Sequence, residues 1–204
     1  MIGNLPQTND NIPSGISSSN IVVAIPFILP AGNNYSLGNV ILRLGDYETG
    51  DNPLVQIRQD NGTDNPGSTV LASFTNPTPQ GTGNFGYTFT PTSPFTFNAS
   101  TKYWLYVTTT SGSFSWRVNQ PSITPTEIAT LSSMPVVSGT GETGLQRFST
   151  NGGATFTSGS MAPSFQINTA DIPPSVATPE PGAIAALSLF GLGLLGVKGR
   201  RNEG

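Results

Sequence analysis

The 204-residue sequence contains neither histidine nor cysteine, and these two absences exclude much familiar site chemistry. Without cysteine the chain has no disulfide, no thiol nucleophile and no thiolate ligand for zinc. Without histidine it can build no Ser-His-Asp triad, no imidazole general base and no imidazole-ligated transition metal. Catalysis would therefore need a carboxylate pair, tyrosine, lysine, or a hard ion held by oxygen atoms.

Charged residues are also scarce. They make up 9% of the chain, against about 25% in an average soluble domain. The 11 acidic and 8 basic residues include no concentrated Lys/Arg patch of the kind that binding to a phosphate backbone requires. We therefore expect no nucleic-acid partner. Gly (24) and Pro (18) are abundant instead, which is typical of short strands joined by turns.

From residue 21 onward, apolar side chains recur at every second position, the pattern of a β-strand with one buried face. Turns rich in Gly, Asn and Pro separate these runs, and no stretch before residue 182 has the period and length of a helix. We predict an all-β domain over residues 21–170, an antiparallel β-sandwich or jelly roll. The clearest alternating runs are Val40–Leu44, Val55–Ile57, Phe85–Phe89 and Phe114–Val118.

The two ends of the chain differ from this central domain. Residues 1–20 have neither the basic nor the apolar segment of a secretory signal peptide, so we expect an irregular segment there, with any export signal upstream. Residues 171–178 are proline-rich and predict a short, semi-extended linker. Residues 179–204 then form a tail of distinct composition.

The tail has three parts in a fixed order. The triplet Pro179-Glu180-Pro181 comes first, and residues 182–197 follow as an apolar run whose only polar side chain is Ser188. As a helix this run would span about 24 Å, short of the roughly 30 Å hydrocarbon core, so it would cross only with bilayer thinning or snorkelling. A buried terminal helix is the alternative, but the run has no polar face. The last part is a basic cluster, as expected for a cytoplasmic end: Lys198, Arg200 and Arg201.

This ordered arrangement resembles the PEP-CTERM sorting signal of Gram-negative bacteria. The resemblance implies export, transient anchoring in the inner membrane by a short hydrophobic helix over residues 182–197, and processing near Pro179-Glu180-Pro181. The partner it implies is an exosortase, a membrane-embedded enzyme resembling a transpeptidase. Proteins of this kind are usually associated with exopolysaccharide, biofilm or the cell surface.

The central domain also resembles a family, over about residues 20–168. Its motifs are similar to those of the choice-of-anchor domains, in particular the R type. Those domains occur beside several alternative surface-anchoring signals, so the resemblance implies a surface location without naming a ligand. The motifs are Ile25-Pro26-Phe27, Tyr35-Ser36-Leu37 before Val40–Leu44, Asn65-Pro66-Gly67-Ser68, Tyr87-Thr88-Phe89, and Thr101–Leu105 followed by Trp116.

The acidic group Asp46, Glu48 and Asp51 is a candidate metal site. Its oxygen ligands and neighbouring glycines suit Ca²⁺, although the spacing is not that of an EF-hand loop. The same residues also fit a solvated hairpin tip. Residues 60–65 have a similar composition, but Asn-Gly followed by Asn-Pro-Gly indicates a turn. We expect no other cofactor.

Aromatic residues offer a second candidate site. If Tyr103, Leu105 and Val107 face the core, then Trp104 and Tyr106 lie together on the opposite face of the strand. Exposed, these two rings would form a platform on which a sugar ring stacks. The alternative is a strand that is buried on both faces.

The leading hypothesis is a non-enzymatic, exported protein of the cell surface or exopolysaccharide matrix. The second hypothesis is a carbohydrate-binding module acting on extracellular polysaccharide. The third is a glycosidase that uses paired carboxylates, for which Glu127 and Glu142 are the candidates. No spacing marks these two residues as a pair.

Overall fold

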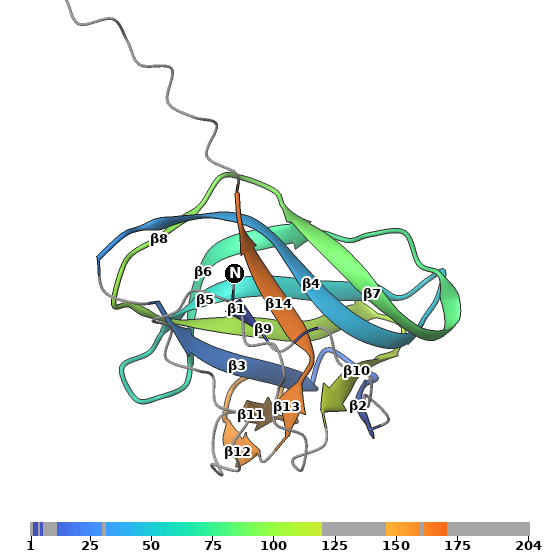
Figure 1. Ribbon diagram of the computed structural model, residues 1–204. Coiled ribbons are helices and arrows are strands. Elements are labelled where there is room, and N and C mark those ends of the chain that lie inside the picture. Colours follow the sequence, from blue (N-terminus) through green and yellow to red (C-terminus); the bar gives the residue numbers. More distant parts are fainter. Residues whose placement is uncertain are drawn as a thin grey trace, which may run out of the picture. The chain divides into compact units, whose positions relative to one another are not determined.

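The computed structural model of the chain describes residues 2–3, 5, 12–29, 32–119, 146–159 and 161–170 (Figure 1). The chain divides into two units, Met1–Asp171 and Ile172–Gly204, and all the described residues belong to the first. Over these residues every regular element is a β-strand, and every strand pair is antiparallel. The prediction of an all-β, antiparallel domain is confirmed.

One group of strands runs in the spatial order β6-β5-β9-β3-β11-β12. The long central pairs of this group are β5 with β9 and β3 with β9. Their bounds are β3 (Val22–Ile28), β5 (Asn52–Asp60), β6 (Pro66–Thr75), β9 (Lys102–Ser111), β11 (Gln146–Ser149) and β12 (Thr157–Gly159).

A second group runs in the order β1-β14-β4-β7, and it connects to the first where the end of β6 pairs with the end of β7. Strand β10 pairs with β4, β2 and β13, and β8 pairs with β4. In Figure 1, β14, β4 and β7 pass in front of β5 and β9. Their bounds are β1 (Ile2–Gly3), β2 (Ile12–Ile16), β4 (Tyr35–Tyr47), β7 (Gly81–Pro91), β8 (Thr96–Phe97), β10 (Phe114–Asn119), β13 (Ala162–Pro163) and β14 (Phe165–Thr169).

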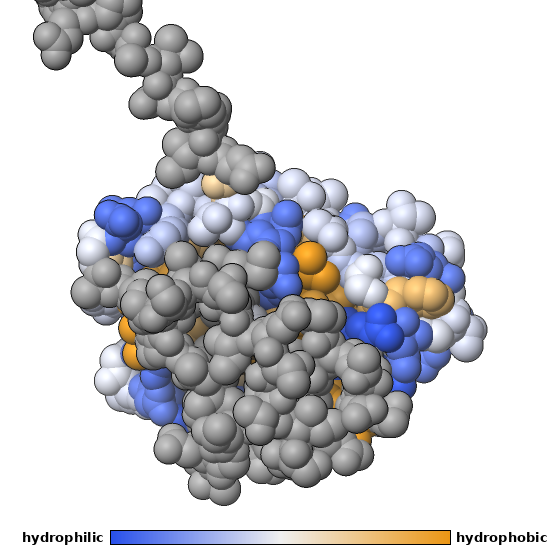
Figure 2. Space-filling view, viewed as in Figure 1, coloured by the Kyte–Doolittle hydropathy of each residue, from blue (hydrophilic) through white to orange (hydrophobic). Residues whose placement is uncertain are grey.

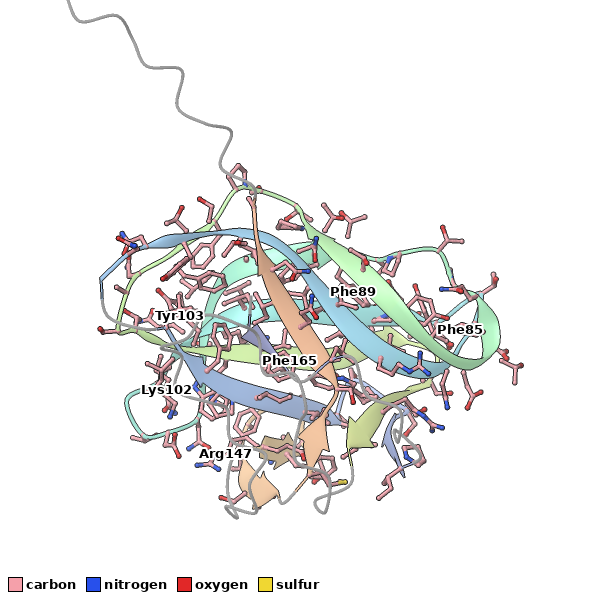
Figure 3. All side chains as sticks on the ribbon, viewed as in Figure 1. Phe85, Phe89, Lys102, Tyr103, Arg147 and Phe165 are labelled. Carbon is pink, nitrogen blue, oxygen red and sulfur yellow. The ribbon has the colours of Figure 1, made fainter. Side chains whose placement is uncertain are left out.

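The main hydrophobic core is built from alternate residues of both strand groups. Leu42 on β4 is opposite Tyr87 on β7 and Phe165 on β14, and all three are at most 1% exposed. Leu105 on β9 belongs to the same cluster from the other group. Figure 3 shows Phe89 and Phe165 on these strands. Each fully buried side chain of this size contributes about 1.5–3 kcal/mol of transfer free energy, so this cluster is the main source of stability.

The prediction of an irregular segment over residues 1–20 is wrong in part. Residues 12–16 form β2, which pairs with β10, and Ile16 is fully buried in the main core. Pro13 and Gly15 interrupt the local strand pattern in the sequence. The extended conformation is therefore stabilised by a partner strand about a hundred residues away along the chain.

Where Figure 2 shows described residues, hydrophilic side chains and smaller apolar patches alternate on the face viewed in Figure 1. Among the described residues the exposed large hydrophobic side chains are Ile28, Val70 and Met161.

The predicted linker over residues 171–178 and the predicted hydrophobic helix over residues 182–197 lie outside the described residues. In the described part of the chain, no helix has the length and apolar character needed to cross a bilayer.

Candidate functional site

Charged and aromatic side chains gather on the face of β5 and β9 that points away from the main core. Val55 and Ile57 of β5 face the core, so Arg58 faces outward, and on β9 the same alternation turns Trp104 outward. We refer to this group as the Trp104 cluster. It consists of Arg58, Asp60, Asp64, Lys102, Trp104, Tyr106 and Arg147.

Trp104 lies at the centre of the cluster. Its indole Nε1 donates to Asp60 Oδ1 at 2.7 Å, which satisfies the one polar group of this fully buried side chain. Lys102 Nζ lies 5.0 Å from the ring centroid and the guanidinium carbon of Arg147 lies 5.9 Å from it. Both distances are within the range of a cation–π interaction, so the ring helps to hold the two cations.

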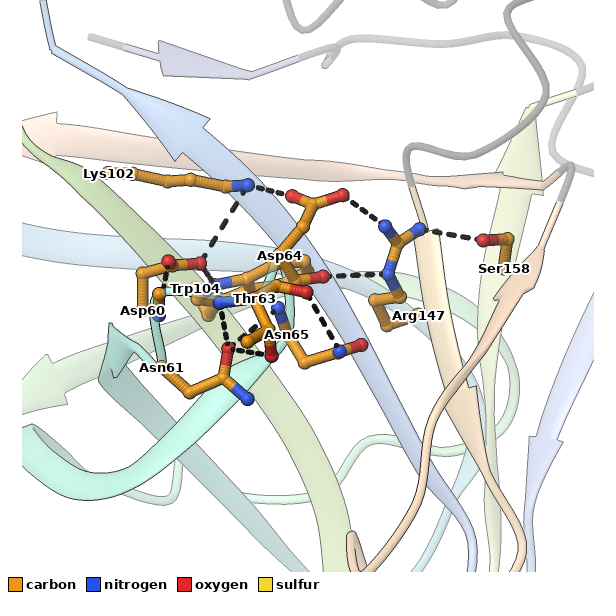
Figure 4. Close-up of polar contacts among 10 residues, drawn as sticks. Asp60, Asn61, Thr63, Asp64, Asn65, Lys102, Trp104, Arg147 and Ser158 are labelled. Carbon is orange, nitrogen blue, oxygen red and sulfur yellow. Dashed lines mark hydrogen bonds and ion pairs between the residues drawn. The ribbon is translucent and has the colours of Figure 1, made fainter.

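The carboxylate of Asp64 bridges these two cations (Figure 4). One oxygen pairs with Lys102 Nζ and the other pairs with the Arg147 guanidinium, whose Nε also donates to the Asp64 carbonyl oxygen at 2.9 Å. Lys102 Nζ lies 3.7 Å from Asp60 Oδ1 as well. Figure 3 shows that Lys102 comes from β9 and Arg147 from β11. The bridge therefore ties the β5–β6 loop to two strands that are distant in sequence.

Local hydrogen bonds shape the β5–β6 loop that presents Asp64. Asn61 Oδ1 accepts from the backbone N–H of Thr63 at 2.8 Å and from its hydroxyl at 2.9 Å. Asp64 itself has φ +62°, in the left-handed region that side chains other than glycine, asparagine and aspartate rarely adopt. Its side chain is 55% exposed. The most solvent-accessible acid of the cluster thus lies in a backbone conformation that aspartate adopts more readily than most other residues.

Arg58 covers the second aromatic ring. Its guanidinium carbon lies 3.5 Å from the ring centroid of Tyr106, and Gln56 Oε1 accepts from Arg58 Nε and Nη2 at 2.9 and 2.8 Å. Burial raises the pKa of Tyr106 above its ordinary value, while the Arg58 cation acts in the opposite direction. Burial likewise lowers the pKa of Arg58, against the effect of Tyr106.

The hypothesis of an exposed aromatic platform is wrong for this structure. Trp104 is 0% and Tyr106 is 3% exposed, and the two form a small second core with Val22 and Ala24. The hairpin of β11 and β12 lies over this face: Phe156 packs against the second core. The strand is thus buried on both faces, the alternative that the alternation left open.

Only glycine fits where the hairpin meets Tyr106. Gly153 has φ +89°, and a Cβ there would lie 3.0 Å from the Tyr106 hydroxyl oxygen. The backbone of the hairpin therefore approaches the hydroxyl end of Tyr106 closely.

The candidate calcium ligands do not converge. Asp46 Oδ1 accepts from the backbone N–H of Gly83 at 3.3 Å, and Asp51 Oδ1 accepts from the N–H of Ser113 at 2.8 Å. Glu48 Oε1 accepts from a β7 hydroxyl at 2.9 Å. Within the described ranges, no group of three or more acidic side chains is placed to hold a metal ion. These carboxylates anchor turns at the β4–β5 end of the domain instead.

The other candidate residues lie outside the described part of the chain. This applies to Pro179-Glu180-Pro181, to the basic cluster Lys198, Arg200 and Arg201, and to Glu127 and Glu142. For these residues only the sequence supports the assignment.

Comparison with protein families identifies the C-terminal segment. Residues 177–202 match the PEP-CTERM protein-sorting motif. Neither the curated proteins nor the solved structures contain a significant match to the chain. The motif indicates export and exosortase-dependent sorting of a surface protein. It therefore implies that an exosortase recognises this segment.

Sequence reasoning found part of the Trp104 cluster and missed the rest. The alternation in β9 placed Trp104 and Tyr106 on one face, as the structure has them. Asp64 and Arg147 were missed, because one lies in a turn and the other in a strand 83 positions later. No local sequence signal joins two residues that meet only through tertiary pairing.

Proposed function

We propose that this chain is a non-enzymatic, exported protein of the cell surface or the exopolysaccharide matrix. The observation that carries the proposal is the sorting motif at residues 177–202, which follows an all-β unit ending at Asp171. In this proposal the β unit is the exported module, and the tail anchors it transiently in the inner membrane before an exosortase processes it.

The β unit is proposed to be a choice-of-anchor domain of the R type, with a sandwich or jelly-roll arrangement. Two features support this. The first is that Phe27, Leu37 and Trp116, which belong to the motifs shared with the choice-of-anchor domains, are all buried in the main core. The resemblance therefore includes side chains that pack the hydrophobic core of this domain. That core also takes residues from both strand groups, as a sandwich requires.

The use of the carboxylates supports a role without catalysis. Asp60 and Asp64 are engaged with Trp104, Lys102 and Arg147, and the acids of the β4–β5 turn bind backbone N–H groups or a hydroxyl. A glycosidase needs two carboxyl groups placed about 5–10 Å apart around an open site, with different pKa values. The described acids instead hold loops in place, and we propose no cofactor.

A carbohydrate-binding module remains the second candidate. The Trp104 cluster favours it because two partly exposed cations, Lys102 and Arg147, lie together over the buried Trp104 ring, where they could bind an anionic sugar.

Intact mass spectrometry of the protein recovered from the native cell surface or medium tests the sorting proposal. We expect a chain that ends near residues 178–181, because processing takes place at the Pro-Glu-Pro triplet. A variant with Pro179, Glu180 and Pro181 changed to alanine should keep its full C-terminus. Pro173→Ala with Pro174→Ala is the matched control, since it changes the same residue type in the linker, and it should be processed normally.

Deleting residues 179–204 provides the second arm of this test. The deletion should abolish membrane association while the β unit still unfolds cooperatively at an unchanged denaturant midpoint, because all the deleted residues belong to the other unit. A full-length mass found only in the membrane or cytoplasm would contradict exosortase processing.

A further inference from the structure

We propose that the Trp104 cluster is a binding site for the carboxylate of an acidic glycan, and that Asp64 occupies this site when no glycan is bound. The ligand class is a polysaccharide or oligosaccharide that contains uronic acid units. This inference rests on the proposed function, since it names the ligand that an exported matrix protein would bind.

The first argument is the geometry around the Asp64 carboxylate. Its two oxygens each meet a different cation, Lys102 on one side and Arg147 on the other. Arginine and lysine placed on the two oxygens of one carboxylate form a recognition arrangement for that group. In the structure the carboxylate of Asp64 makes the contacts with Lys102 and Arg147 that we propose for the carboxylate of the glycan.

The second argument is that Lys102 and Arg147 are supported from beneath. Trp104 lies under both cations, and its indole is fixed by the hydrogen bond to Asp60. Arg147 Nη1 also donates to the Ser158 hydroxyl at 3.0 Å, which orients the guanidinium. The two cations therefore have supports that do not depend on Asp64.

The third argument is that Asp64 is displaceable. Its side chain is 55% exposed, and exposed ion pairs are weak. The side chain of Lys102 is 26% exposed and that of Arg147 is 11% exposed, and movement of Asp64 would uncover the atoms of both cations that its carboxylate contacts.

The fourth argument is the charge balance of the cluster. Displacing the Asp64 carboxylate leaves three cations of the cluster, Arg58, Lys102 and Arg147, beside one acid among its described residues, Asp60. The net positive charge that remains favours an anionic sugar over a neutral one. An otherwise acidic chain, with a formal net charge of −3, thus has a cationic site for a glycan carboxylate.

Asp64→Asn tests the proposal in the full-length chain with oligogalacturonate as the probe, by isothermal titration calorimetry at low ionic strength. Asparagine adopts a left-handed φ readily, so the loop should keep its conformation. We expect Asp64→Asn to bind about tenfold more tightly than the wild type, because the internal competitor for the site is removed. Adding Lys102→Gln to Asp64→Asn should abolish the gain.

Glu48→Gln is the matched control. It removes one negative charge at the other end of β5, outside the cluster, and should leave the affinity for oligogalacturonate unchanged. A neutral oligosaccharide of equal length should bind neither variant. Asp64→Gly, which also accepts a positive φ, repeats the measurement if the asparagine variant folds poorly.

Three outcomes would overturn the inference. They are no binding by either Asp64 variant, an equal gain in Glu48→Gln, and equal binding of the neutral sugar. Each is independent of the processing assay: normal C-terminal processing with no uronate binding removes this inference alone, whereas failed processing leaves the titration result standing.

Discussion

Gln146 shows how one buried side chain departs from the usual rule of polar satisfaction. It is 1% exposed at the start of β11, and among the described residues neither Oε1 nor Nε2 of its amide has a hydrogen-bond partner. Its Oε1 lies 3.2 Å from the position that a Cβ on Gly159 would take. A buried amide without partners loses its hydration and gains nothing in exchange, so this residue lowers the stability of the fold.

Gln146→Leu should therefore raise the free energy of unfolding by about 1–3 kcal/mol, measured by urea titration. Leucine has a similar size and needs no hydrogen bond. Gln56→Leu is the matched control: Gln56 is also buried, at 9% exposed, but it accepts two hydrogen bonds from Arg58, so this variant should be less stable. A loss of stability in Gln146→Leu would show that the amide is satisfied.

Strand β14 depends on a bulge that only glycine permits. Its register against β4 shifts between Asn168 and Thr169, where Thr169 pairs with Leu37. A Cβ on the adjacent Gly38 would lie 2.6 Å from the Thr169 carbonyl oxygen, and backbone atoms cannot yield as a flexible side chain does. β14 is also the last strand among the described residues, so this bulge lies near the end of the described part of the β unit.

Gly38→Ala should accordingly lower the free energy of unfolding by about 1–3 kcal/mol, through the clash with β14. Hydrogen exchange should show the loss of protection concentrated in β14. Gly86→Ala, on the neighbouring strand β7, is the control: its nearest contact would be Ile41 Cγ2 at an ordinary 3.9 Å. That substitution should be neutral or stabilise by up to about 1 kcal/mol, and equal losses in both variants would refute the bulge argument.

The stability of the β domain as a whole should depend on pH in the alkaline range. Burial is the main cause that raises the pKa of Tyr106 and of Tyr47 above the ordinary value of 10.0, and for Tyr47 the neighbouring Tyr87 and Asp51 add to the shift. The unfolded chain ionises these phenols near the ordinary value, and the folded chain does so only at higher pH. Between the two values the folded state holds more protons, so its stability falls as the pH rises.

Stability should therefore be at its full value below the unfolded pKa and decrease as the pH rises above it. Urea titrations from about pH 8 to about pH 11 measure this slope. Tyr106→Phe combined with Tyr47→Phe should flatten it, although Tyr47→Phe also removes the hydrogen bond that Tyr47 Oη donates to the Pro77 carbonyl at 2.9 Å. A slope that is unchanged in the double variant would assign alkaline unfolding to other groups.

Much of the β architecture was predictable from local pattern. Val40, Leu42 and Leu44 alternate with outward residues, and all three are fully buried. The same alternation predicts that Arg58 and Trp104 lie on the face of their strands that points away from the main core. It could not say that this second face is also buried, because its cover, the β11–β12 hairpin, lies some forty residues farther along the chain.

Two levels of information therefore define this protein. The tail was readable without coordinates, because a sorting signal acts through the local order of a triplet, an apolar run and a basic end, and residues 177–202 contain that order. Strand faces were readable too, since side chains alternate along any β-strand. The strand order, β2 within residues 1–20 and the Asp64 bridge between Lys102 and Arg147 came only with tertiary pairing. Each of these features joins segments that are far apart in the sequence. The periodicity of side chains along one strand gives no information about which distant segment that strand will contact.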